Sequence, residues 1–225
     1  MPYKAVSTFL AGSKIATAAD LAAATQDLLN DLRLHLRHGA TDAFKSFWNE
    51  DQHGKPLHPK SENSCRDRLL DLIDHRARVM GIAVEREGSM AESKRCDIKA
   101  IEANYRIPIE IKTAFHRKLW SALDLQLRAM YARDPAAGGN GIYVVLWFGN
   151  VPGRAIPIPP KGIGTPRSGP ELEDCLRNQI PSDFRQCLEV LVFDVSKPNL
   201  VRALKQRKKR IRSKRQRRIS GASSD

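Results

Sequence analysis

The stretch GIYVVLWFG, residues 141–149, constrains the fold more than any other part of the sequence. Its side chains are apolar or aromatic at every position between the two glycines, and successive side chains of a strand point to opposite faces. A strand that is apolar on both faces belongs in the middle of a sheet that is covered on both sides. The sequence therefore predicts an α/β fold built on a central sheet.

Helices and further strands are expected on either side of this stretch. Thr17 and Ser61 have the character of helix N-caps, and apolar residues recur at helical spacing behind each of them. Pro170 is placed at the start of a later helix, where proline is tolerated. The expected helices are 18–38, 62–80, 117–133 and one that starts at 170, and the expected strands are 82–87, 95–101, 106–112, 141–148 and 188–195.

The segment RCDIKAIEANYRIPIEIK, residues 95–112, reads as a hairpin that carries charge. Strand alternation places Glu110 and Lys112 on one face, and Asp97 on the partner strand can lie beside them. Such charges form a poor core because unpaired buried charges are costly. Two carboxylates do suit Mg²⁺, which prefers oxygen ligands. The alternative is an ordinary surface hairpin with a salt bridge.

Two polar residues interrupt the apolar stripes of the expected helices. Glu62 lies on the stripe of helix 62–80, and Gln126 lies on the stripe of helix 117–133. Either residue can face a site on the sheet. The plainer alternatives are a first-turn acid stabilised by the helix dipole and by Arg66, and a glutamine bonded to backbone groups.

The net charge of +13 is concentrated in the last part of the chain. From Arg202 onward there are eleven Lys/Arg residues and one acid, so the preceding residues carry only +3. This segment has too few apolar residues to fold alone and suits a polyanion. The expected nucleic-acid contacts are Lys205, Arg207, Lys208, Lys209, Arg210, Arg212, Lys214, Arg215, Arg217 and Arg218. Localisation signals and solvated ends have similar sequences.

Compartment is indicated by what the sequence lacks. No apolar run reaches the roughly 18–20 residues of a membrane helix, and the first residues do not have the pattern of a signal peptide. The four cysteines show no C-x-x-C spacing. We therefore expect a cytoplasmic protein with reduced thiols and no membrane association.

The motifs KRCDIKA, PIEIK and LDLQLRAMY occur in this order, and together they resemble the PD-(D/E)XK nuclease superfamily. The segments KSENSCRDRLLDLI and RDPAAGGNGIYVVLWFG also look like a bacterial branch of that superfamily. The resemblance covers about residues 58–150. Tyr131 lies five residues after Gln126 rather than the four of related recombination nucleases, so no role is carried over to it.

The resemblance implies a restriction-endonuclease-like core, with a mixed central sheet flanked by helices in the order α-β-β-β-α-β. The implied domains are an N-terminal helical extension (1–57), the nuclease-like domain (58–200) and a disordered basic tail (201–225).

The resemblance also implies a metal-dependent nuclease, and the substrate expected first among the nucleic acids is DNA. Asp97, Glu110, the Ile111 carbonyl and Glu62 would hold Mg²⁺ or Mn²⁺, Lys112 would activate a water, and Gln126 would orient the water or the phosphate. A homodimer or a larger partner is compatible with this assignment.

Two rival interpretations stay open. One is a catalytically inactive nuclease fold that binds nucleic acid through its basic tail, although a pure binder has no need of Asp97, Glu110 and Lys112 together. The other is a chance motif in an unrelated α/β domain.

Overall fold

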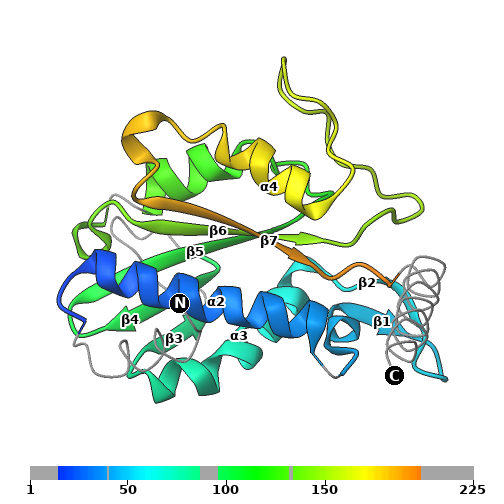
Figure 1. Ribbon diagram of the computed structural model, residues 1–225, viewed down its shortest axis with the longest axis horizontal. Coiled ribbons are helices and arrows are strands. Elements are labelled where there is room, and N and C mark those ends of the chain that lie inside the picture. The colour runs from blue at the N-terminus through cyan, green and yellow to red at the C-terminus, as the bar shows by residue number, and fades with distance from the viewer. Residues whose placement is uncertain (1–14, 40, 87–95, 132–133, 199–225) are drawn as a thin grey trace, which may run out of the picture.

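The computed structural model describes residues 15–39, 41–86, 96–131 and 134–198. Its centre is a five-stranded sheet in the order β3-β4-β5-β6-β7 (Figure 1). β3, β4 and β5 pair antiparallel, and β5, β6 and β7 pair parallel, so the sheet is mixed. The strands are β3 (Ala83–Arg86), β4 (Ile98–Glu102), β5 (Tyr105–Thr113), β6 (Gly141–Trp147) and β7 (Leu188–Asp194).

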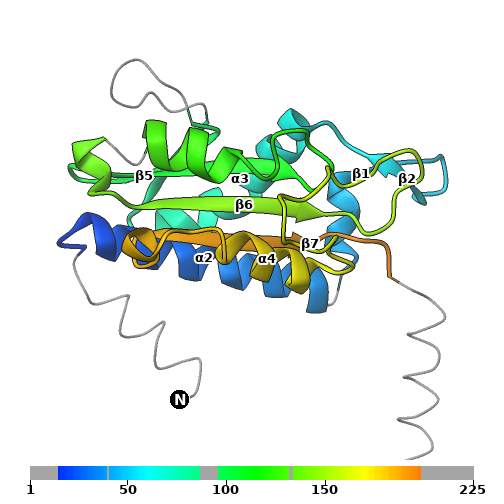
Figure 2. The same cartoon turned by 90° about the horizontal axis from the view of Figure 1, so that it is seen from above.

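Helices cover both faces of this sheet (Figures 1 and 2). The helices α2 (Ala18–His38) and α3 (Glu62–Val79) pack on one face, and α4 (Gly169–Arg177) and η3 (Leu123–Tyr131) pack on the other. All seven residues of β6 are buried, with Val144 facing the first helix pair and Val145 facing the second. The predicted α/β architecture with a mixed sheet flanked by helices is therefore confirmed.

The predicted starts of α2 and α3 are found at the expected residues. Thr17 and Ser61 each accept a backbone hydrogen bond from the third residue after them, Asp20 and Ser64, as N-caps do. After α3 the chain turns at Gly81, whose φ of +76° is a conformation that glycine adopts without strain. Cys65 and Cys96 are buried free thiols, and Cys175 and Cys187 are half-buried free thiols.

The helix α2 belongs to the main core rather than to a separate extension. Leu21, Leu29 and Leu32 are fully buried in the same cluster as Ile109 and Ile111 of β5. The expected boundary at residue 57 therefore does not divide two cores. Among the described helices, none has both the length and the apolar character that crossing a bilayer requires.

Between α2 and α3 the chain forms η1 (Ala43–Phe47) and a hairpin of β1 (Trp48–Glu50) and β2 (Pro56–Pro59). The indole N–H of Trp48 donates to the carbonyl of Val195 at 2.7 Å, which holds the hairpin beside the end of β7. This contact spans 147 positions, so no local pattern predicts it.

The helix expected at 117–133 begins later and is differently wound. Residues 117–121 form turns, and η3 is a π-helix that begins at Leu123. The carbonyl of Leu119, which would accept from Leu123 in a regular α-helix, accepts the Tyr143 hydroxyl at 2.8 Å. A side-chain donor from β6 thus competes for the first turn of the expected helix.

Candidate functional site

The site begins where β4 and β5 stop pairing. The last pair is Ile98 with Ile109, and beyond it no strand of the described residues pairs with that edge of β5. The backbone N–H of Ile111 donates instead to Asp97 Oδ2 at 2.9 Å, and the N–H of Thr113 donates to Glu62 Oε2 at 3.1 Å. Two carboxylates therefore take the place of a strand, and each has its second oxygen left for other partners.

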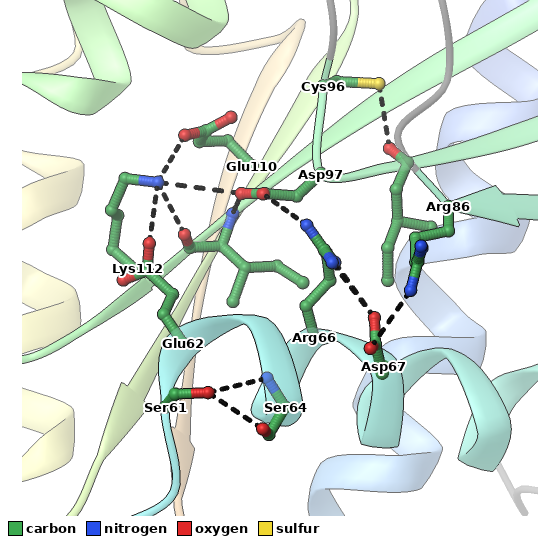
Figure 3. A network of polar contacts seen from close by, with 12 residues as sticks. Ser61, Glu62, Ser64, Arg66, Asp67, Arg86, Cys96, Asp97, Glu110 and Lys112 are labelled. Carbon is green, nitrogen blue, oxygen red and sulfur yellow. Dashed lines mark hydrogen bonds and ion pairs between the residues drawn. The ribbon is translucent and has the colours of Figure 1, made fainter.

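The ammonium of Lys112 lies among the oxygens of this site (Figure 3). Its Nζ atom is 2.6 Å from Glu110 Oε1, 2.8 Å from the Ile111 carbonyl oxygen and 3.3 Å from Glu62 Oε1. Asp97 Oδ2 is an ion-pair partner at 3.6 Å. The structure thus brings together Glu62, Asp97, Glu110, Ile111 and Lys112, five of the residues that the sequence analysis proposed for a site.

Negative charge is in excess around Lys112. Three carboxylates surround one ammonium, and the side chains of Glu110 and Lys112 are 2% and 6% exposed. Burial and the nearby Asp97 carboxylate raise the pKa of Glu110 to about 7, although Lys112 opposes this shift. Burial alone would lower the pKa of Lys112, but the carboxylates of Glu110, Asp97 and Glu62 raise it above its usual value. The ammonium therefore stays charged while Glu110 titrates near neutrality.

A second cation approaches from α3. Arg66 is 6% exposed, and its Nη1 lies 3.8 Å from Asp97 Oδ1, while its Nε and Nη2 donate to Asp67. The sequence suggested Arg66 only as a neighbour of Glu62. The available signal was its position four residues after Glu62, which places both side chains on one face of the helix.

The structure treats the other predicted site residues differently. Gln126 is half-buried on η3, and within the described part of the chain its Oε1 is buried without a hydrogen-bond partner. The described contacts do not join it to Asp97, Glu110 or Lys112. The ten basic residues predicted between Lys205 and Arg218 lie outside the described residues.

The donor set of the site fits a hard divalent cation. Three carboxylates and a strand carbonyl are oxygen ligands of the kind that Mg²⁺ and Mn²⁺ prefer. As the side chains lie, no three His, Cys, Asp or Glu side chains of the described residues are grouped to hold a metal ion. The oxygens converge on the Lys112 ammonium, so that ammonium and a metal ion would compete for the same oxygens.

The fold and the site together define a class of protein. It is a mixed α/β domain in which carboxylates surround a buried lysine where the two strands of the central hairpin separate. Residues 21–150 match the model of a family described as a domain of unknown function, DUF8371, and the chain belongs to this family. The match runs from α2 to β6 and so includes every residue of the site. Comparison with curated proteins found no match, and comparison with solved structures found none either.

Proposed function

We propose that this protein is a metal-dependent nuclease of the PD-(D/E)XK superfamily, with a restriction-endonuclease-like core and with DNA as its first expected substrate. The observation that carries the proposal is the convergence of Glu62, Asp97, Glu110 and the Ile111 carbonyl on the Lys112 ammonium. The motif resemblance in the sequence, which includes Asp97, Glu110 and Lys112, agrees with it.

The cost of this cluster argues for a functional role. Burying ion pairs contributes little to stability unless their geometry is excellent, and apolar residues of similar size are often as good. Here Glu110 is held so far from water that its pKa reaches about 7. A fold that needed only packing at this position would gain by replacing Glu110 and Lys112 with apolar residues.

The roles of the residues follow from their positions. The oxygens of Asp97, Glu110, Ile111 and Glu62 would hold Mg²⁺ or Mn²⁺. When bound, such an ion lowers the pKa of a water that it holds and neutralises charge on the phosphate. The Lys112 ammonium donates to the attacking water or to a non-bridging phosphate oxygen, where it stabilises the charge that builds up on phosphorus.

The remaining residues position this chemistry. Arg66 holds Asp97 from the side opposite Lys112. Gln126 Oε1 has no hydrogen-bond partner among the described residues and would accept a proton of the water. Hydrolysis adds the water oxygen to phosphorus, breaks the bond to one sugar oxygen and leaves a proton on that oxygen.

Incubating the full-length protein with supercoiled plasmid and Mg²⁺ or Mn²⁺, beside the same reaction in EDTA, tests the proposal. We expect cleavage only with the metal, and its loss in Asp97→Asn and Lys112→Ala. Asp71→Asn is the matched control, since Asp71 is an exposed acid of α3 that pairs with Arg68 rather than with Arg66.

Equal cleavage by wild type, Asp97→Asn and Lys112→Ala would indicate a contaminant and contradict the proposal. Binding without cleavage of any DNA or RNA would favour the inactive binding module.

A further inference from the structure

A groove of about 630 Å³ opens beside the site. Its walls come from the end of β2 and the start of α3, from the residues after β5, and from the turn after β6 that carries Arg154. Glu62 and Thr113 line it and also belong to the carboxylate cluster. The groove lies where the parallel strands β5 and β6 end, which is the usual edge for ligands in such sheets.

The lining of this groove is basic. It includes Lys60, Arg117 and Arg154, and Glu62 is the one acid among the described residues that line it. His116 also lines it, and its Nδ1 accepts the backbone N–H of Lys118 at 3.1 Å, which leaves Nε2 as the donor of the neutral ring. These cations and donors suit a chain of phosphates that leads to the carboxylate cluster.

An aromatic platform lies in the same groove. The guanidinium of Arg154 lies over the ring of Phe115, 4.9 Å from its centroid. Phe115 packs on Phe148 with ring centroids 5.7 Å apart, and Phe148 packs on Trp48 at 5.2 Å. Phe148 and Trp48 hold the Phe115 ring in place, and the planar guanidinium of Arg154 lies on that ring.

We propose that this groove binds an unpaired nucleic-acid strand beside the scissile phosphate. Its backbone lies along Lys60 and Arg117, and one base stacks on the pair formed by Arg154 and Phe115. The proposal rests on the nuclease function above and names the substrate class of that same site. Guanidinium planes and aromatic rings are the surfaces on which unpaired bases stack, and a paired base keeps its faces inside the duplex.

The test measures binding by the full-length protein in EDTA, so that cleavage plays no part. The probes are a labelled twelve-residue oligothymidylate, the same length with abasic positions, and a blunt duplex of equal length. Arg154→Lys keeps the charge and removes the plane, Arg154→Ala removes both, and Arg117→Ala removes a cation that the proposal assigns to the phosphates. Arg106→Ala is the matched control, because Arg106 is exposed near the start of β5, at the opposite end of that strand from Thr113.

We expect Arg154→Lys to weaken oligothymidylate binding at least about fivefold, the lower end of what stacking of one base contributes. The same variant should leave binding of the abasic strand and the duplex unchanged. Arg117→Ala should flatten the salt dependence on single strands by about 0.7 in log–log slope, the share of one phosphate. Arg106→Ala should match wild type.

Each contrary outcome has a separate meaning. If Arg154 and Arg117 variants bind like Arg106→Ala, the groove does not hold nucleic acid and the inference is overturned. If Arg154→Lys loses as much on duplex as on single strand, the assignment of an unpaired strand is overturned. Groove-dependent binding without metal-dependent cleavage would overturn the proposed function and leave the groove assignment in place.

Discussion

The Glu110 carboxylate and the Lys112 ammonium lie 2.6 Å apart, almost completely buried, on the same face of β5. Neighbouring acids prevent this contact from being a balanced ion pair, because Asp97 and Glu62 share the same ammonium. The pair is therefore sensitive to any change that removes a negative charge or supplies another positive one.

Removing the charge of Glu110 should change how stability depends on pH. The pKa of Glu110 is about 7 in the folded protein against an ordinary value of 4.5, so the folded state binds its proton more tightly than the unfolded state does. The free energy of unfolding of wild type, relative to Glu110→Gln, should therefore fall as pH rises from about 4.5 to 7 and stay level above that. The total change is on the order of 3 kcal/mol.

Urea denaturation in EDTA across this pH range measures the difference. Parallel curves for wild type and Glu110→Gln would show that Glu110 is not held in its protonated form by the fold.

Replacing Lys112 should expose the competition between the ammonium and a metal ion. In EDTA, Lys112→Met leaves three carboxylates without their ammonium and should lower stability by on the order of 3–5 kcal/mol. Mg²⁺ or Mn²⁺ should raise the melting temperature of this variant more than that of wild type, because a ligand that binds only the folded state stabilises it. Lys99→Met, which removes a buried lysine paired with Glu85, is the control and should show no such gain.

The charge of Glu62 should matter more for cleavage than for folding. In Glu62→Gln the amide oxygen can still accept the Thr113 N–H, so the end of β5 keeps its partner. We expect little loss of thermal stability and cleavage roughly 10–100-fold slower, the range for residues that support a metal site. Glu85→Gln is the control at an exposed acid. Unchanged cleavage by Glu62→Gln would remove Glu62 from the site.

Gln126 offers a contrast between stability and activity. A buried amide oxygen without a partner destabilises a fold by about 1–3 kcal/mol, so Gln126→Leu should raise the melting temperature. If the same oxygen accepts a proton of the attacking water, this variant should also cleave more slowly. A Gln126→Leu protein that cleaves at the wild-type rate would show that the amide does not take part in the chemistry.

Truncation after Leu204 should separate binding from cutting. Ten of the fourteen residues from Lys205 to Arg218 are basic, and phosphate contacts of such a segment do not depend on base sequence. The truncated protein should bind duplex DNA more weakly, and each lost phosphate contact should flatten the salt dependence by about 0.9. Cleavage at saturating DNA should be largely unchanged. A titration at several salt concentrations checks this, and an unchanged slope would assign the tail to localisation or a protein partner.

Local patterns were sufficient for the elements that carry their own signal. The apolar run of β6 predicted a strand buried on both faces, and Ser61 predicted the start of α3 because a hydroxyl cap serves only the helix that follows it. Alternation along β5 placed Glu110 and Lys112 on one face. The prediction that Asp97 lies beside them came from pairing the two strands of one hairpin.

Other features depend on contacts that are distant in sequence. The hairpin of β1 and β2 is held by the bond from Trp48 to Val195, and the first turn of the expected helix at 117–133 is altered by the Tyr143 hydroxyl. The approach of Arg66 to Asp97 depends on how α3 packs against β3 and β5 of the sheet. Side chains such as these have ordinary local surroundings in the sequence, so periodicity does not reveal their partners.

The hydrogen bond from Thr113 to Glu62 joins residues 51 positions apart, whereas Asp97 and Ile111 are only 14 apart. A nascent chain can therefore form the hairpin and its first carboxylate early, but the second carboxylate arrives only when α3 docks on the finished sheet. Closing the longer loop is the slower event, because contacts of greater sequence separation form later in folding. If the site hydrolyses phosphodiester bonds as we propose, an unfinished or partly unfolded copy would lack the second carboxylate and would be inactive.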